Sequence, residues 1–418
     1  MPGGAIAQPA DPSVKSVGPY ALVAELGRGG TANVFLAVER EQLNAAPVVL
    51  KVLRAYDEDH ELRRMFANES QIALRLRHPN VIRTFDAGQE GRNTYLVMEH
   101  LRGRPLSKLL GPSGDVPLPL ALLVLADALE GLHYAHELRD EGGKSYDIVH
   151  RDVSPQNVFV TYDGDVKMLD FGAAKFTDAT AATAVGTIKG RLRYMAPEQA
   201  AGRPLDRRAD IFSMGVMLWQ ALHGRHLWGD LDDATVVSRL LRGDIPPSSA
   251  PDEGASPALL AACQRALSLE PARRFESAAA FAGTLREELA THGERGSREA
   301  LRAHLATRFA VEKERAERVV DVRLRQISTG LTPTSGLSRP RPKLRPWELA
   351  LVALSTVVPA VCVALLGSLF FVRPHDAPHE TAPPPAPAAA SAAPSAAAPT
   401  ASGPAPSGSV APTAPPPP

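Results

Sequence analysis

The chain has 418 residues, and its 46 basic and 46 acidic side chains give a formal net charge of zero. This balance lacks the basic excess of a protein that binds nucleic acid through its overall charge, so no nucleic-acid partner is expected. The two cysteines, Cys263 and Cys362, lie in segments that predict a globular helix and a membrane span, so no disulfide framework is expected, which suits a folded part in a reducing compartment. Residues 1–18 are rich in Gly, Pro and Ala and lack the apolar core of a signal peptide. We therefore expect a flexible leader and a cytoplasmic N-terminus.

Residues 19–100 predict a small β-rich region. Residues 58–77 are the exception, because Leu62, Phe66, Glu69 and Ala73 recur at the helical spacings of three and four. The predicted strands are apolar or alternating runs separated by turn residues, at 20–26, 34–39, 48–53, 81–87 and 94–99.

After residue 101 the pattern becomes helical. The predicted helices cover residues 120–136, 210–223, 235–241, 257–269 and 277–291. We expect the folded unit to end near Thr291. A charged helix is predicted over 297–326, with a Ser cap and with Leu301, Leu305 and Phe309 at fourfold spacing. It is read either as a dimerisation or regulatory helix or as a solvated spacer with one weakly docked stripe.

A membrane span is predicted near the C-terminal end. Residues 349–372 carry no charge and exceed the roughly 20 residues that cross a bilayer. The positive-inside rule places the part before the span in the cytoplasm and the C-terminus outside a cell (inner) membrane. Residues 377–418, built of Ala, Pro, Ser, Gly and Thr, are expected to be disordered. The basic residues just before the span are Arg339, Arg341, Lys343 and Arg345.

A glycine-rich turn lies between the first two predicted strands, in Gly27-Arg28-Gly29-Gly30-Thr31-Ala32-Asn33-Val34. Because a strand follows the turn instead of a helix, we interpret it as a hairpin lid over phosphates and not as a Rossmann turn. Glycines allow the backbone to approach phosphate oxygens closely. A plain glycine-rich hairpin is the alternative.

Lys51 follows the apolar run Val48-Val49-Leu50. A lysine in a buried strand needs an acidic partner or an anion. Glu69 lies in the apolar stripe of the next predicted helix, and we expect it to pair with Lys51 and hold it against the α- and β-phosphates of a nucleotide. The alternative is a surface lysine and a solvated glutamate.

Three motifs follow in order: His150-Arg151-Asp152-Val153-Ser154-Pro155-Gln156-Asn157, Asp170-Phe171-Gly172 and Ala196-Pro197-Glu198. Phosphoryl transfer requires a carboxylate directed at the attacking hydroxyl and metal ions held on the phosphates. Asp152, Asn157 and Asp170 could supply these groups from two neighbouring loops. The motifs therefore predict a phosphotransferase.

With these motifs, residues from about 20 to 291 resemble the eukaryotic-like (Hanks-type) bacterial serine/threonine protein kinases, especially those with a single membrane span. The resemblance implies an α+β, bilobal protein-kinase fold with a small β-rich N-lobe and a larger α-helical C-lobe. It implies ATP as phosphoryl donor, Mg²⁺ (or Mn²⁺) as metal, and protein substrates phosphorylated on Ser or Thr. It also allows a homodimer for autophosphorylation in trans.

The resemblance assigns roles to individual residues. Asp152 would accept the proton of the substrate hydroxyl, and Asn157 and Asp170 would hold the metal. Met98 would be the gatekeeper, Asp210 would brace the catalytic loop, and Glu198 would pair with Arg274. The implied nucleotide-binding residues are Leu26, Gly27, Gly29, Val34, Val49, Lys51, Glu69, Glu99, Leu101 and Phe159.

Two positions depart from the family pattern. Ser154 stands where serine/threonine kinases usually carry a lysine that steadies the γ-phosphate, so turnover is in question unless Lys189 or another base takes that role. Gly190-Arg191-Leu192 replaces a Gly-Thr-Pro-like run, which leaves the preferred hydroxyl open.

Arg151, directly before Asp152, indicates control by a phosphate on the activation loop. The candidate sites for autophosphorylation are Thr177, Thr180, Thr183 and Thr187.

Two other functions are weighed against an active protein kinase. A pseudokinase or scaffold would bind nucleotide with little turnover, and Ser154 is the local argument for it. A small-molecule phosphotransferase of the same fold is disfavoured by the length of the activation loop and by Ala196-Pro197-Glu198. The expected organisation is a leader (1–18), a kinase domain (19–291, with lobes 19–100 and 101–291), a juxtamembrane helix and basic linker (292–346), a transmembrane helix (347–373) and a Pro/Ala-rich tail (374–418).

Overall fold

The computed structural model describes residues 16–29, 32–41, 46–53, 66, 70–91, 93–110, 116–171, 192–247 and 255–328. The chain separates into a unit of residues 1–337 and a unit of residues 338–418, and every described residue belongs to the first. The predicted membrane span and the predicted tail therefore lie outside the described residues.

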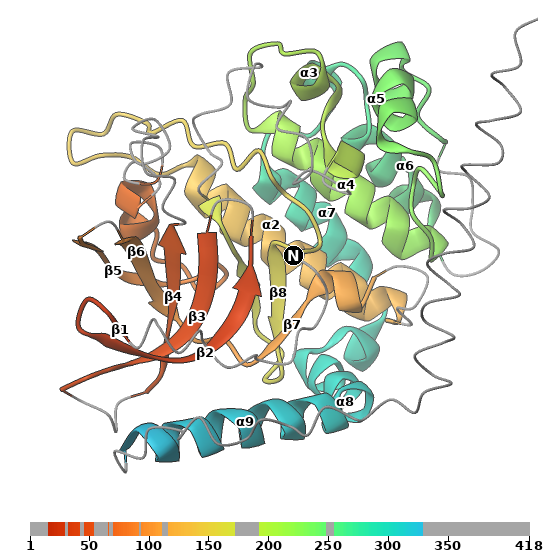
Figure 1. Ribbon diagram of the computed structural model, residues 1–418. Coiled ribbons are helices and arrows are strands. Elements are labelled where there is room, and N and C mark those ends of the chain that lie inside the picture. The colour runs from red at the N-terminus through yellow and green to blue at the C-terminus, as the bar shows by residue number, and fades with distance from the viewer. Residues whose placement is uncertain are drawn as a thin grey trace, which may run out of the picture. The chain divides into compact units, whose positions relative to one another are not determined.

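An antiparallel sheet of six strands forms the N-lobe (Figure 1). Its order in space is β1-β2-β3-β4-β6-β5. The strands are β1 (Ser16–Val17), β2 (Tyr20–Arg28), β3 (Ala32–Glu39), β4 (Val48–Leu53), β5 (Thr84–Glu90) and β6 (Asn93–Glu99). The five predicted strands are confirmed with shifted ends. Two details differ: β1 belongs to the predicted leader, and Val81 precedes β5 and bridges Met168.

Alternation along β3 makes both faces of this sheet apolar. Phe35 and Ala37 pack on one face with Leu50 of β4. Leu36 and Val38 lie in a separate cluster with residues of β2. Successive side chains of a strand point to opposite faces, so a strand without polar alternation must be covered on both sides.

The helix predicted over 58–77 is described only in part. Phe66 and residues 70–75 are helical, and the helix ends before residues 76 and 77. Phe66 and Ala73 pack with Val49, Leu96 and Met98 of the sheet, which confirms the apolar stripe. Glu69 lies outside the described residues, so its pairing with Lys51 stays a prediction.

The C-lobe combines helices with a small sheet of order β7-β8-β9. Side chains of Asp232, Ser256 and Ser277 accept hydrogen bonds from backbone amides and fix the starts of three of its helices. The strands are β7 (Gly103–Pro105), β8 (Val158–Thr161) and β9 (Val166–Met168). The α-helices are α2 (Leu118–His136), α3 (Pro197–Ala200), α4 (Arg208–His223), α5 (Asp233–Arg242), α6 (Pro257–Ala266) and α7 (Ala278–Ala290). The 3₁₀ helices are η1 (Leu106–Lys108), η4 (Leu192–Tyr194), η5 (Pro271–Arg273) and η6 (Gly293–Gly296).

Helix α2 is apolar on nearly every side because it forms the centre of the C-lobe. Among the described residues it is the helix long and apolar enough to cross a bilayer, with a mean hydropathy of 1.4. Its side chains from Leu120 to Leu129 are buried in the main core. Helix α4 is buried in the same core.

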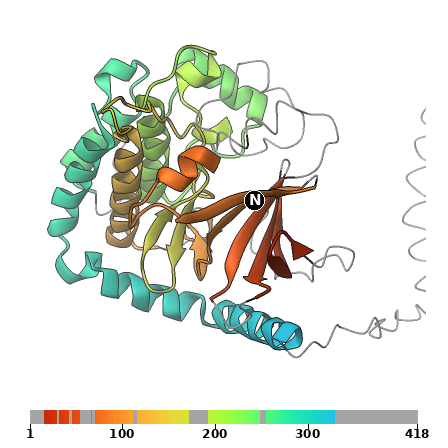
Figure 2. The ribbon, with the colours of Figure 1, turned by 90° about the vertical axis from the view of Figure 1, so that its left-hand side faces the viewer.

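The core continues beyond Thr291, so the expected end of the folded unit is wrong. Two helices stand where one was predicted: α8 (Arg298–Arg308), capped by Ser297, and α9 (Ala310–Ser328). Leu301, Leu305 and Phe309 are buried in the C-lobe core, because their fourfold spacing places them on one helical face. The reading as a weakly docked spacer is also wrong. Figure 2 shows α8 beside the helices of the C-lobe and α9 continuing to the N-lobe sheet.

We expect Leu305→Ala to destabilise the full-length protein by about 2–5 kcal/mol, as for other large-to-small changes in a core. Val311→Ala is the matched control, because Val311 lies on the next helix and is 74% exposed. Its effect should stay within about 0.5 kcal/mol. Urea unfolding followed by tryptophan fluorescence measures both. Equal unfolding midpoints for the two variants would contradict the packing of α8 in the core.

Candidate active site

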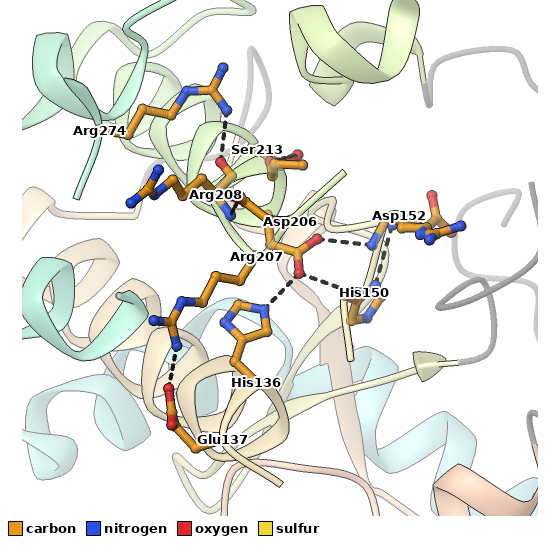
Figure 3. Close-up of polar contacts among 12 residues, drawn as sticks. His136, Glu137, His150, Asp152, Asp206, Arg207, Arg208, Ser213 and Arg274 are labelled. Carbon is orange, nitrogen blue, oxygen red and sulfur yellow. Dashed lines mark hydrogen bonds and ion pairs between the residues drawn. The ribbon is translucent and has the colours of Figure 1, made fainter. Parts of the chain in front are cut away.

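One buried carboxylate, that of Asp210 at the start of α4, organises the loop that carries the predicted catalytic aspartate. Its Oδ2 accepts the backbone N–H of His150 at 2.8 Å and lies 2.8 Å from Nε2 of His136. Its Oδ1 accepts the N–H of Arg151 at 2.9 Å. Figure 3 shows the polar contacts around the labelled His136 and His150. The predicted brace of the catalytic loop is confirmed.

Three donors keep Asp210 charged in the protein interior. Burial raises the pKa of this carboxyl, but the hydrogen bond and charge of His136, together with His150, outweigh burial and lower it overall. The hydrogen bonds from the amides of His150 and Arg151 to Asp210 also hold an unusual backbone conformation. Arg151 has a φ of 64°, in the left-handed region that non-glycine residues seldom adopt.

Asp152 and Asn157 are held together at the other end of the loop. The Asn157 side-chain amide donates to the Asp152 carboxylate at 2.8 Å and to the Asp152 backbone carbonyl at 2.7 Å. The amide therefore fixes both the main chain and the carboxylate of Asp152. The predicted base and one predicted metal ligand form a single unit.

A second loop brings Asp170 to the same place. The N–H of Leu169 donates to the carbonyl of Asn157 at 2.8 Å, and the Leu169 carbonyl lies 2.8 Å from Nε2 of His150. Asp170 follows with a φ of 51°. Phe171 packs on the His150 ring with centroids 4.7 Å apart. Asp170 is thus aligned by contacts on both of its neighbours.

Lys51 reaches this loop from the N-lobe sheet. Its Nζ lies 3.0 Å from Oδ1 of Asp170, and the lysine side chain is only 14% exposed. Lys51 thus has Asp170 as an acidic partner, as a lysine in a buried strand requires, while the predicted pairing with Glu69 stays a prediction. The structure therefore brings Lys51, Asp152, Asn157 and Asp170 together, as the motifs predicted.

An apolar surface adjoins these polar groups. Leu26, Val34 and Val49, which were predicted to bind the nucleotide, share one cluster with the predicted gatekeeper Met98. A pocket between the sheet and Asp170 is lined by Ala73, Leu76, Val81, Ile82, Thr84, Leu96, Met98, Asp170 and Phe171.

The connection between the lobes lies beside this apolar surface. The Glu99 carboxylate is bound by Lys167 at 2.9 Å and by the Arg83 amide at 2.8 Å. Leu101 follows in the connection, and Phe159 lies half-buried on β8.

The glycine-rich turn is a hairpin in its described part. Strands β2 and β3 pair antiparallel up to Arg28 and Asn33, with an irregularity between Glu25 and Gly27. The Gly29 amide donates to the Ala32 carbonyl at 2.8 Å. A strand and not a helix follows the turn, which confirms the distinction from a Rossmann fold.

The pair Glu198 and Arg274 is confirmed as a buried, two-pronged ion pair. The Arg274 nitrogens lie 2.6 and 2.8 Å from the two carboxylate oxygens. Arg274 also donates to the Arg208 carbonyl and lies over the Phe212 ring. The pair anchors the start of α3 to the C-lobe core.

Several predicted residues lie outside the described part of the chain. They are Glu69, Gly172, Lys189, Arg191 and the four loop threonines Thr177, Thr180, Thr183 and Thr187. Ser154 is described and buried, and among the described residues its hydroxyl has no hydrogen-bond partner.

Two residues of the site were not predicted from the sequence. His136 binds Asp210, and Gln199 donates from its amide to the Arg151 carbonyl at 2.9 Å. A histidine at the end of an otherwise buried apolar helix was the available signal for His136. No local pattern marks Gln199.

Arg151 is a partly buried cation. Burial lowers the pKa of its guanidinium, while the charge of Asp210 acts in the opposite direction. Within the described chain its Nε has no hydrogen-bond partner. A guanidinium placed in this way is suited to an added anion.

The sequence model of the protein kinase domain family matches residues 20–283, which is more than half of the chain. The chain belongs to the protein kinase family. The bilobal fold and the place of the motifs within it agree with this assignment.

Relatives of this kinase chain include bacterial proteins. The tyrosine-protein kinase MasK of Myxococcus xanthus is 37% identical over 308 residues, which cover 72% of this chain and 48% of MasK. The serine/threonine-protein kinase PknL of Mycobacterium tuberculosis is 33% identical over 277 residues, or 65% of this chain and 66% of PknL. Pkn1 of Myxococcus xanthus, named a serine/threonine-protein kinase, is 38% identical over 287 residues, or 66% of this chain and 39% of Pkn1. The matches thus span from under half to about two thirds of these relatives.

We expect Asp210→Asn to destabilise the full-length protein by about 3 kcal/mol or more at pH 7, because the amide leaves a buried network of donors without its anion. The folded pKa of Asp210 is lowered, so its charge stabilises the protein above the unfolded aspartate pKa of about 3.9. That contribution is lost as the pH falls through the folded pKa.

Urea unfolding at pH 7 and at pH values below about 4 measures the difference between wild type and variant. The difference in free energy of unfolding should be largest at pH 7 and should shrink in acid. Asp163→Asn, at an exposed turn residue, is the control and should change little. A difference that grows in acid would contradict the assignment.

Proposed function

We propose that this chain transfers the γ-phosphoryl group of ATP to Ser and Thr hydroxyls of proteins, with Mg²⁺ as the metal. One observation carries the proposal: Asp152, Asn157, Asp170 and Lys51 meet at one place, although they come from the N-lobe sheet and from two loops of the C-lobe. These are the groups that phosphoryl transfer needs.

Asp152 is the proposed base. Its carboxylate is held by the Asn157 amide, so it keeps one direction toward an incoming hydroxyl. A base that is already oriented lowers the entropic cost of reaching the transition state. Asp152 would take the proton of that hydroxyl as its oxygen attacks the γ-phosphorus, and the bond from that phosphorus to the β,γ-bridging oxygen would break with ADP as the leaving group.

Asn157 and Asp170 fit a magnesium ion by the chemistry of their donors. Mg²⁺ prefers oxygen ligands and is commonly bound through one or two carboxylates plus substrate phosphates. Asn157 directs its amide nitrogen to Asp152, so its amide oxygen faces a different side. When bound, the metal neutralises charge on the phosphates. Lys51, which contacts Asp170, adds positive charge at the same place.

The proposed nucleotide site lies between the lobes. Leu26, Val34, Val49 and Met98 would contact the adenine from the N-lobe and Phe159 from the C-lobe, while the main chain at Glu99 and Leu101 would provide polar contacts. Gly27 and Gly29 would let the hairpin approach the phosphates, and Glu69 would hold Lys51. The shared apolar cluster of the N-lobe residues supports this site.

Phosphotyrosine formation is the second candidate. Ser154 replaces the lysine usual in serine/threonine kinases, and MasK is named a tyrosine-protein kinase. PknL and Pkn1 are named serine/threonine-protein kinases, which favours the first candidate. A pseudokinase is disfavoured, because all four groups are present, with Lys51 paired to Asp170 and Asn157 bonded to Asp152.

We also propose the location expected from the sequence, and its domain division except for the end of the folded unit, which continues through α8 and α9. Residues 19–291 carry the activity, and residues 347–373 anchor the chain in the cell membrane. The kinase domain then lies in the cytoplasm and the tail 374–418 outside. The absence of charge from residues 349–372 supports this proposal.

We expect Asp152→Asn to lower transfer of ³²P from ATP by about 10²–10⁴-fold, because general base catalysis is lost. Nucleotide affinity should stay unchanged. Autophosphorylation and phosphorylation of a basic protein in Mg²⁺ provide the assay, with phosphoamino-acid analysis of the product. Asp163→Asn is the control and should retain activity.

Full transfer by Asp152→Asn would show that another group is the base. Phosphotyrosine as the sole product would replace the first candidate by the second. Phosphoserine or phosphothreonine is the expected product.

Arg151 and the activation loop give a separate prediction. Phosphopeptide mapping of active protein should find phosphate on one or more of Thr177, Thr180, Thr183 and Thr187. Arg151→Gln should lower activity by about tenfold, as expected from the loss of one charge-assisted hydrogen bond. Arg139→Gln, on an exposed loop, is the control. Active protein in which these threonines are all unmodified would contradict loop control.

A further inference from the structure

Helix α9 lies beyond the residues that match the kinase domain, yet it contacts the N-lobe sheet. Val320 and Leu324, one helical turn apart, pack on the apolar cluster of Val23, Ala24, Leu36 and Val38. Leu26 of β2 belongs to this cluster and also to the cluster of Val49 and Met98 at the proposed adenine site. The helix therefore touches a strand that forms part of the nucleotide site.

The same helix contacts the connection between the lobes. Arg102, between β6 and β7, pairs with Glu317 at 3.5 Å. Arg104 of β7 lies 4.0 Å from the Glu312 carboxylate, with its guanidinium over the Phe309 ring. Exposed ion pairs of this kind add little stability. They do match opposite charges along the helix, which sets its position against the connection.

The N-terminal end of α9 is fixed to the C-lobe. Phe309, directly before the helix, is buried in the C-lobe core. Lys313 lies over the ring of Tyr162, with Nζ 5.5 Å from the centroid. Tyr162 in turn donates its amide to the Arg102 carbonyl at 2.9 Å. In Figures 1 and 2, α9 runs from this attachment to the strands of the N-lobe.

We propose that α9 is an interlobe strap that positions β2 and the connection between the lobes for nucleotide binding. The inference rests on the proposed function, since it names positioning residues for that site outside the family's domain. Val320, Leu324, Glu312 and Glu317 act through β2 and the two arginines and do not touch the nucleotide.

The physical reason is the cost of closing a site made of two halves. A nucleotide between two lobes binds only when the lobes have the right separation, and its apparent affinity falls with the fraction of molecules in that state. Helix α9 has 19 residues and is attached to both lobes, so it disfavours separations of the lobes that do not bind nucleotide. The strap therefore raises ATP affinity without adding a contact to ATP.

The test compares two double variants of the full-length protein. Val320→Ser with Leu324→Ser removes the apolar contact with β2. Val311→Ser with Val322→Ser likewise replaces two apolar side chains of α9 by Ser, at positions that are 74% and 54% exposed, and serves as the matched control. Binding of a fluorescent ATP analogue in Mg²⁺ gives Kd, and the transfer assay gives KM and kcat.

The strap variant should raise Kd and KM for ATP by about five- to tenfold, a typical coupling between sites. Its kcat at saturating ATP should be unchanged, as expected when only binding is affected. Hydrogen exchange of the β2 amides, residues 20–28, should become faster. The control should match wild type in all these readouts, and Leu324→Met should retain the wild-type affinity.

Urea unfolding checks that the double variant is folded. If it is not, Leu324→Ala replaces it as a milder variant and should shift Kd in the same direction. Unchanged Kd in the folded strap variants, or an equal shift in the control, would overturn the strap. The Kd readout needs no phosphoryl transfer. If the wild-type protein binds nucleotide but transfers no phosphate, the proposed function is refuted. The Kd values of the strap variant and the control still test the strap in that case.

Discussion

The buried charge of Asp210 is the constraint on which the site depends. A carboxylate in a protein interior is costly unless donors surround it. Asp210 has three, and two of them are consecutive backbone amides of the loop that carries Asp152. The charge therefore requires the loop to take one conformation, including the left-handed backbone at Arg151. The orientation of Asp152 follows from a residue that takes no part in the proposed chemistry.

The contacts that begin at Asp210 continue to the N-lobe. His150 contacts the Leu169 carbonyl and the Phe171 ring, so the loop fixed by Asp210 also holds the residues on either side of Asp170. Asp170 then meets Lys51 from the N-lobe sheet. A chain of polar contacts thus runs from the core of the C-lobe to a strand of the N-lobe, and phosphate and metal are expected at its end.

Residues beyond the kinase domain belong to the same folded body. Leu301, Leu305 and Phe309 extend the C-lobe core, and α9 carries the chain from that core back to the N-lobe sheet. The segment between the catalytic domain and the predicted membrane span is thus built of two docked helices in its described part.

Local periodicity and motif spacing were enough to predict five strands of the N-lobe sheet, most of the α-helices and the four polar residues of the site, but not β1 or the small sheet of the C-lobe. The sequence by itself could not place Lys51 on Asp170, find His136 and Gln199, or separate a docked α8 from a solvated spacer. Those outcomes depend on contacts between residues far apart in the chain, such as Lys51 with Asp170 or Leu324 with β2. An apolar stripe reveals that a helix has a face to bury, and only the packed fold decides what covers it.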